Sequence, residues 1–311
     1  MVRWRRSDPY LSVILIVFRM PRQATNTLAS LLPPYQRGVS HKDYEIIVVE
    51  NESDQMLEAD LIEAMGRNVR YLRREEPSQS PAAAINAGVS MARARHVAIM
   101  VDGARMVTPG LIRNLLAVRR LGKTAVGSVP GYHLGSKLHQ EAVKSGYDET
   151  VEQSLLAEIG WPADGYRLFE QAVLSASCER GYLVPLAESN CLMLSRRLFG
   201  RVGGCDERFT TPGGGYVNLD LYKRVVESPG VQLYVLPGEG TFHQYHGGAT
   251  TGSREIDRDA LMPQLAAEYQ TLRGGPYQHP AVPSSLFGTI PDPALPFLAH
   301  SLSAKTKEWQ A

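Results

Sequence analysis

Short, continuous apolar runs rich in β-branched residues recur along the first third of the chain. "LSVILIVF" (11–18), "YEIIVVE" (44–50), "VRYLRR" (69–74) and "HVAIMVD" (96–102) predict strands. Strands that are apolar throughout, rather than at alternate positions, are typical of a parallel sheet covered by helices on both faces. The sequence therefore predicts an α/β, doubly wound fold.

Helical patterns separate these runs and continue after them. The predicted helices cover residues 24–31, 55–66, 80–94 and 217–227, and two further strands are predicted at 191–195 and 231–237. Residues 132–186 are helical, acidic and aromatic in character, which predicts a helical insertion. Residues 274–299 are rich in proline, which predicts an extended tail along the surface.

The composition excludes some partners. The 311 residues carry 33 Lys and Arg against 32 Asp and Glu, so no electrostatic footprint points to nucleic acid. No segment approaches the roughly 20 apolar residues of a membrane span, and the run at 11–18 favours a strand over a signal sequence. Three cysteines without CxxC spacing fit a reducing cytoplasm. Peripheral attachment to the inner face of a membrane and oligomerisation stay open.

Two of the predicted strands end in an acid, Glu50 and Asp102. In open α/β sheets, ligands bind beyond the carboxyl ends of the strands. An acid after a strand is also common as the N-cap of the next helix, and for either residue alone this alternative is equally acceptable. Two acids on one edge of a sheet favour a ligand site.

Four sequence blocks then occur in a specific order. They are "SVILIVFRMPRQATNTLASLL", "DYEIIVVENESDQ", "AAAINAGVSMARARHVAIMVDGA", and "NCLMLSRRLFGRVGGCDERF" followed by "NLDLYKRV". Together they resemble family 2 glycosyltransferases with the GT-A fold. The resemblance implies a Rossmann-like, mostly parallel sheet with a helical acceptor-side insertion and an extended C-terminal tail.

The resemblance also divides the chain. It implies a single GT-A domain over residues 1–273, with a nucleotide-binding half at about 10–130 and an acceptor-side half at about 131–255. Residues 274–311 would be a proline-rich C-terminal extension.

By resemblance, the donor's diphosphate is met by a divalent cation, Mn²⁺ or Mg²⁺, held by an Asp-x-Asp motif. Hard cations prefer carboxylate oxygens. Here the motif is Asp102-Gly103-Ala104, which keeps the first acid and replaces the second by a methyl group. Three interpretations follow: the cation is held differently, a protein cation replaces it, or catalysis has been lost.

Two histidines and two arginines support the first two interpretations. His243 and His246 follow the last predicted strand, where similar enzymes often have a metal-ligating histidine, so Asp102, His243 and His246 are the candidate metal ligands. The alternative is that one histidine forms a hydrogen bond in the core and the other lies on the polar surface. Arg105 and Arg254 are candidate phosphate ligands, because a guanidinium donates two parallel hydrogen bonds.

The catalytic base is the second departure from the family. An inverting transferase needs a carboxylate to take the acceptor's proton. The family supplies it before "DL", where this chain has Val217 and Asn218. Asp220 and Glu188 are the remaining candidate bases, and Asn218 can orient a hydroxyl. For Asp220, an ion pair with Arg224 is nearly as good an interpretation.

By resemblance, the nucleotide lies against the ends of the first strands. Val17 and Phe18 frame the base, and Glu50 accepts a hydrogen bond from it. Asn86 lies near the diphosphate, and Asp102, Gly103, Ala104 and Arg105 complete the donor pocket.

The sequence therefore predicts a glycosyltransferase that moves a sugar from a nucleoside-diphosphate sugar to a glycan, a lipid-linked or a small-molecule acceptor, with inversion implied by the resemblance. A degenerate domain that binds a nucleotide sugar or glycan without turnover is the alternative. A nucleotidyltransferase is disfavoured, because "RMPRQ" after the first strand contains no glycine.

Overall fold

The computed structural model describes residues 8–246 and 258–310, and the predicted doubly wound, mostly parallel sheet is confirmed. The larger of two sheets has eight strands. In spatial order they are β12 (Ser284–Leu286), β10 (Gln232–Val235), β6 (Ala125–Ser128), β9 (Leu192–Ser195), β4 (His96–Met100), β1 (Leu11–Val17), β2 (Tyr44–Asn51) and β3 (Val69–Arg74). Neighbours are parallel except at β9, which runs antiparallel to β4 and β6.

Ten α-helices occur in the described residues. They are α1 (Pro21–Leu31), α2 (Ala59–Ala64), α3 (Ala82–Met91), α4 (Leu111–Val118), α5 (His139–Ala142), α6 (Glu149–Glu158), α7 (Arg196–Arg201), α8 (Val217–Val226), α9 (Arg258–Arg273) and α10 (Leu295–Gln310). None of these helices is both long enough and apolar enough to cross a bilayer.

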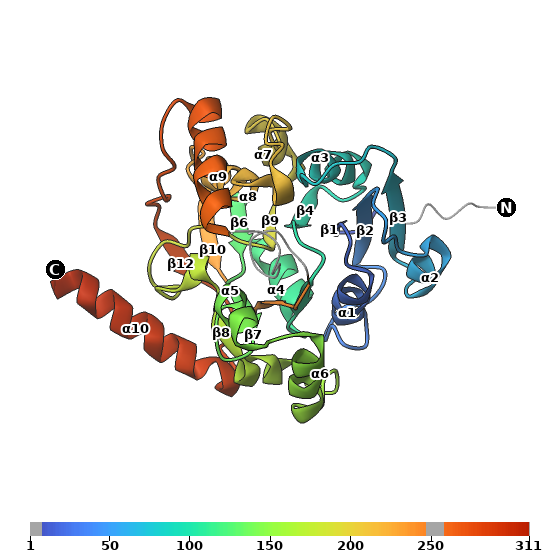
Figure 1. The fold of residues 1–311 in the computed structure, drawn as a ribbon, viewed down its shortest axis with the longest axis horizontal. Helices are drawn as coiled ribbons and strands as arrows, with labels where there is room; N and C mark the ends of the chain where they lie inside the picture. The colour runs from blue at the N-terminus through green and yellow to red at the C-terminus, as the bar shows by residue number, and fades with distance from the viewer. Residues whose placement is uncertain (1–7, 247–257, 311) are drawn as a thin grey trace.

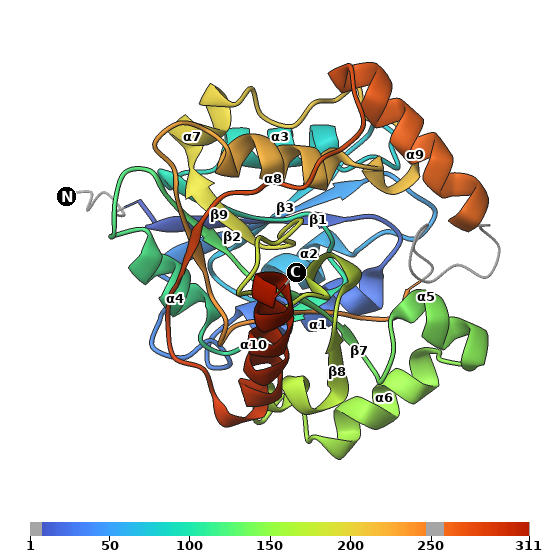
Figure 2. The ribbon, with the colours of Figure 1, turned by 90° about the vertical axis from the view of Figure 1, so that its left-hand side faces the viewer.

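Helices on both faces explain the continuous apolar strands. Along β1, Ile14 and Ile16 pack into one apolar cluster, whereas Val13 and Leu15 pack into the other. In Figure 2, α3, α7 and α8 lie on one side of the sheet, and α1 and α4 lie on the other. Both sets of alternate side chains are therefore removed from water, so every position in the strand favours an apolar residue.

A smaller sheet adjoins the first one. Its order is β5 (Arg105–Val107), β11 (Thr241–His243), β7 (Gly131–Leu134) and β8 (Ala172–Leu174). Because β11 lies between β5 and β7, His243 is paired with Arg105 on one side and with His133 on the other. This register places Arg105, His243 and His133 side by side across three neighbouring strands.

The predicted helical insertion at 132–186 is right only in part. It contains α5, α6 and 3₁₀ segments, among them η2 (Gly165–Gln171), but it begins within β7 and also includes β8. These strands have four and three residues. Such short strands produce no period that a sequence pattern could reveal.

The C-terminal segment differs from the prediction at its end. Residues 275–283 have no regular secondary structure, and β12 then joins the edge of the larger sheet beside β10. The last element is the helix α10, which extends away from the body (Figure 1). The proline pattern does not predict α10, yet Pro296 lies in its first turn, where a missing N–H breaks no helical hydrogen bond.

Candidate functional site

A cleft of about 650 Å³ lies at the carboxyl ends of β1, β2 and β4, against the smaller sheet. This volume is typical of small-ligand sites. Of the residues predicted from the sequence, Phe18, Asp102, Arg105, Glu188, Asn218, His243 and His246 line it. The position agrees with the rule for ligand binding in open α/β sheets.

Asp102, His243 and His246 come together in the wall of this cleft. Nε2 of His243 lies 3.1 Å from Oδ2 of Asp102 and 3.0 Å from Nε2 of His246. Nε2 of His246 lies 3.9 Å from Oδ1 of Asp102. One carboxylate and two imidazoles at these separations form a donor set that fits a divalent cation.

The turn between β4 and β5 fixes Asp102. Its Oδ1 accepts a hydrogen bond of 2.9 Å from the backbone N–H of Ala104. The strand β5, not a helix, follows this turn. The alternative that Asp102 caps a helix is therefore wrong.

Burial and neighbouring charges set the protonation of the cluster. Burial lowers the pKa of His243 well below its usual value and also lowers the pKa of His246, which favours neutral rings at pH 7. Burial raises the pKa of Asp102, but His243, His246 and Arg105 outweigh it and hold that pKa well below the usual value. Behind these residues, burial lowers the pKa of His139 to about 4.

Arg105 brings an incompletely paired positive charge to the same wall. Its Nε lies 3.3 Å from Oδ2 of Asp102, and its side chain is only 8% exposed. Nε and Nη1 are buried and have no hydrogen-bond partner among the described residues. Buried donors without partners are costly, so these N–H groups are available to a ligand in the cleft. Arg254, the other predicted phosphate ligand, lies outside the described residues.

Gly103 and Ala104 do not line the cleft, contrary to the prediction. Ala104 is fully buried in an apolar cluster that includes Met20 and Val107. A Cβ on Gly103 would lie 2.9 Å from both the carbonyl oxygen of Ile16 and Cγ2 of Val17. Both residues are small because the turn packs tightly, and a second motif acid at position 104 would be buried away from the cation donors.

Val17 and Glu50 also lie behind the wall and not in it. Val17 is fully buried in the core. Glu50 is fully buried, and its carboxylate accepts hydrogen bonds from the N–H of Leu57 and, at 2.6 Å, from the hydroxyl of Tyr71. The carboxylate therefore supports the loop before α2, and the next residue, Asn51, lines the cleft instead.

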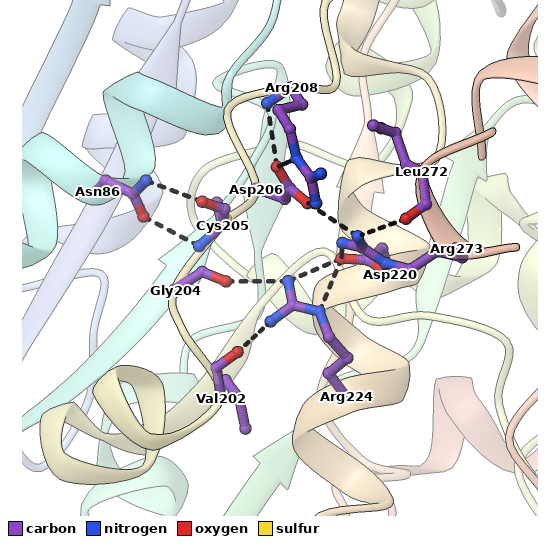
Figure 3. A network of polar contacts seen from close by, with 10 residues as sticks. All are labelled: Asn86, Val202, Gly204, Cys205, Asp206, Arg208, Asp220, Arg224, Leu272 and Arg273. Carbon is purple, nitrogen blue, oxygen red and sulfur yellow. Dashed lines mark hydrogen bonds and ion pairs between the residues drawn. The ribbon is translucent and has the colours of Figure 1, made fainter. Parts of the chain in front are cut away.

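Asn86 is a structural residue and is not part of the cleft lining. Its Nδ2 donates to the carbonyl of Cys205 at 2.9 Å, and its Oδ1 accepts from the N–H of Cys205 at 3.0 Å. Figure 3 shows this two-way bond joining α3 to the turn after α7. The prediction that Asn86 contacts the diphosphate is corrected accordingly.

Asp220 is bound by arginines and lies away from the cleft lining. It accepts from Nε of Arg224 at 2.8 Å and from Nε and Nη2 of Arg273 at 2.6 and 2.8 Å (Figure 3). It is 1% exposed. The prediction of Asp220 as a base is thus wrong, and the alternative of an ion pair with Arg224 is confirmed.

Glu188 and Asn218 are joined by a hydrogen bond in the lining of the cleft. Nδ2 of Asn218 donates to Oε2 of Glu188 at 2.7 Å. The other oxygen has a longer contact, 3.5 Å from Nδ2 of Asn190. Within the described part of the chain, Asp102 and Glu188 are the carboxylates that line the cleft.

Sequence reasoning missed two histidines and a glycine loop. His133 lines the cleft, and His139 lies behind His243. Four of the eight histidines thus gather here, which their count alone did not signal. Pro212, Gly213 and Gly215 of this loop also border the cleft, and Gly213, Gly214 and Gly215 have φ of 73°, 77° and 51°. The run "PGGG" was the available signal, because such φ values favour glycine.

Comparison with known proteins identifies the family. The sequence description "Glycosyl transferase family 2" matches residues 12–175, just over half of the chain. No curated protein sequence matches. Similar solved structures include S. aureus TarS (14% identity, TM-score 0.49, covering 84% of this chain and 39% of TarS) and TarS 1-349 in complex with UDP-GlcNAc (14% identity, TM-score 0.49, covering 84% and 66%). This chain thus spans about two fifths of the full TarS chain. On the match over residues 12–175, the chain belongs to glycosyl transferase family 2.

Proposed function

We propose that this protein transfers a sugar from a nucleoside-diphosphate sugar to an acceptor hydroxyl, with inversion at the anomeric carbon. One observation carries the proposal: a single cleft has cation donors and an unsatisfied guanidinium on one side, and a carboxylate held by an amide on the other. A transferase needs positive charge for its leaving group and a base for its acceptor.

Asp102, His243 and His246 would hold the cation. Two imidazoles beside one carboxylate suit Mn²⁺ better than Mg²⁺, which prefers oxygen ligands. When bound, the cation neutralises charge on the departing diphosphate. Arg105 adds buried N–H donors next to Asp102, and these are available to a phosphate oxygen.

Glu188 is the proposed base. Its carboxylate takes the proton of the acceptor hydroxyl while that oxygen bonds to the anomeric carbon, and the bond from that carbon to the diphosphate oxygen breaks on the opposite side. Asn218 donates to Oε2 and orients the carboxylate. Phe18, which lines the cleft, is the proposed stacking partner of the nucleobase.

The proposal also includes a cellular location and a class of acceptor. The three cysteines are free and buried, which supports a cytoplasmic location. The acceptor is a glycan, a lipid-linked sugar or a small molecule, and it would enter beside Glu188 and the glycine loop at 212–215.

The first experiment incubates the protein with Mn²⁺ and a panel of nucleotide sugars and measures the release of nucleoside diphosphate. We expect release from at least one donor, even by slow hydrolysis in the absence of an acceptor. Thermal stabilisation by a nucleoside diphosphate with no release from any donor would instead establish the binding-only alternative.

The second experiment replaces Glu188 by Gln. The donor Kd should stay within about threefold, whereas kcat should fall by roughly 10²–10⁴-fold, the usual contribution of a general base. Glu170→Gln is the matched control, because Glu170 is an exposed acid paired with Arg167. Equal activity of the two variants would exclude Glu188 as the base.

A further inference from the structure

A second layer of histidines lies behind the cation donors. His139, the first residue of α5, is fully buried, and its Nδ1 lies 2.9 Å from Nδ1 of His243. Its Nε2 lies 2.9 Å from the carbonyl oxygen of Leu134. His139 therefore connects the backbone of β7 to a proposed metal ligand.

The partners of His139 decide where its proton sits. A carbonyl oxygen only accepts, so Nε2 of His139 carries the hydrogen and donates it to Leu134. In a neutral ring the other nitrogen, Nδ1, is then an acceptor. Nδ1 of His243 must donate to it, which leaves Nε2 of His243 with a free lone pair.

That lone pair faces another acceptor. Nε2 of His243 is 3.1 Å from the ionised Asp102 carboxylate. Two acceptor atoms that face each other at this distance repel, unless a cation lies between them. The same arrangement is what a metal requires of a neutral imidazole.

We infer that His139 is a positioning residue for the cation site: it holds His243 in the Nδ1–H tautomer, so that Nε2 is presented as a metal ligand. The inference rests on the cation site of the proposed function. His133 supports the same arrangement, because its Nδ1 accepts the backbone N–H of His139 at 2.9 Å. The ring of Tyr147 also packs near His139, with 5.1 Å between the ring centroids.

The group His133, His139 and His243 is better explained by this hydrogen bond than by a second ion. Nδ1 of His133 already accepts the backbone N–H of His139, so this lone pair is not available to an ion. The observed 2.9 Å between His139 and His243 is a hydrogen-bond distance.

The first test needs neither a variant nor turnover. Long-range ¹⁵N–¹H NMR of the metal-free protein reports which nitrogen of each imidazole carries hydrogen. We expect His243 protonated at Nδ1 and His139 protonated at Nε2. A His243 ring protonated at Nε2 would overturn the inference, whatever the activity of the enzyme.

The second test measures Mn²⁺ affinity by the EPR signal of the free ion. His139→Phe keeps the ring but removes the acceptor, and we expect affinity to fall by roughly 10–100-fold. His139→Asn places an amide oxygen close to the former Nδ1, and its affinity should remain within about threefold of the native value. His96→Phe, a histidine substitution in β4 away from the cleft lining, is the control.

The outcomes separate this inference from the transferase proposal. Equal losses in His139→Phe and His139→Asn, or no loss in either, would overturn the positioning role, as would two Mn²⁺ ions bound per chain. A native protein that releases no nucleoside diphosphate but passes both tests would refute the proposed function alone.

Discussion

Two aspartates, Asp102 and Asp220, have opposite environments. Both oxygens of Asp220 accept charged hydrogen bonds from Arg224 and Arg273 (Figure 3). Asp102 accepts one backbone hydrogen bond and otherwise faces Nε of Arg105 at 3.3 Å and Nε2 of His243 at 3.1 Å. One acid is fully paired within the protein, whereas the other has bonding capacity left for a ligand.

Hydrogen-bond and ion-pair partners, more than sequence position, separate a structural acid from a functional one. Asp220 follows a family-like motif more closely than Glu188 does, yet the arginines around it satisfy its charge. A catalytic or ligand-binding group needs an incompletely satisfied environment.

Asp102→Asn should abolish most activity with a smaller loss of stability than Asp220→Asn. Asn keeps the size and can still accept from the N–H of Ala104, but it lacks the charge that the cation and Arg105 require. We expect kcat to fall by roughly 10³-fold and the unfolding free energy to fall by about 1–2 kcal/mol, because Asp102 is partly exposed and its pair with Arg105 is long. Nucleoside diphosphate release and urea unfolding measure the two. Activity within tenfold of native would place the leaving-group site elsewhere.

Asp220→Asn should lower stability strongly and leave kcat nearly unchanged. Removing this charge leaves Arg224 and Arg273 without their shared partner at a buried position, so we expect a loss of about 3 kcal/mol in unfolding free energy. The kcat of the folded fraction should stay within about threefold. Asp54→Asn, which breaks an exposed pair with Arg19, should leave the urea midpoint unchanged. Reduced kcat at native stability would reinstate Asp220 as a catalytic candidate.

The fold was largely predictable, because continuous apolar strands require helices on both faces. β1 to β4 follow directly from that pattern. β7, β8 and α10 do not, because strand pairing within the smaller sheet and the packing of α10 depend on contacts far along the chain. Ala294, just before α10, packs in the same cluster as Tyr132 and Phe169.

Part of the cleft lining was predictable, from two strand ends and from the family resemblance that selected Glu188 and Asn218. Asp102 and His243 lie at such ends and reach the cleft. The predictions for Glu50 and Asn86 were wrong because their hydrogen-bond partners are distant in the sequence, so a local pattern does not indicate them. Tyr71 lies 21 residues from Glu50, and Cys205 lies 119 residues from Asn86. Pairing across the chain thus decides which polar residues stay available.

Arg105→Lys tests the leaving-group side with a smaller change. Lys keeps a positive charge near Asp102 but loses the planar fork that gives two hydrogen bonds to a phosphate. We expect the Kd for a nucleoside diphosphate to rise about tenfold, measured by calorimetry at fixed Mn²⁺. Arg37→Lys, at an exposed pair with Asp164, is the control. An unchanged Kd would mean that Arg105 only neutralises Asp102.

Glu152 is a third kind of acid: it is buried like Asp220, but its partners offset only part of the cost of burying its charge. It accepts from the N–H of Tyr245, next to His246, and from Arg22. Burial raises its pKa to about 7, against the opposing effects of Tyr245 and Arg22. Because the folded state holds this proton more tightly than the unfolded state, Glu152 lowers stability as pH rises from about 4.5 to about 7.

Replacing Glu152 by Gln should remove that slope. Between pH 5 and pH 7.5 we expect the unfolding free energy of the native protein to fall by roughly 2 kcal/mol relative to Glu152→Gln, because a pKa raised to about 7 by burial makes ionisation costly in the folded state. Taking the difference between the two proteins cancels the titration of the histidines. Glu149→Gln, which removes the more exposed partner of Arg22, should keep the native slope. Parallel pH profiles for native protein and Glu152→Gln would mean that Glu152 is compensated as fully as Asp220.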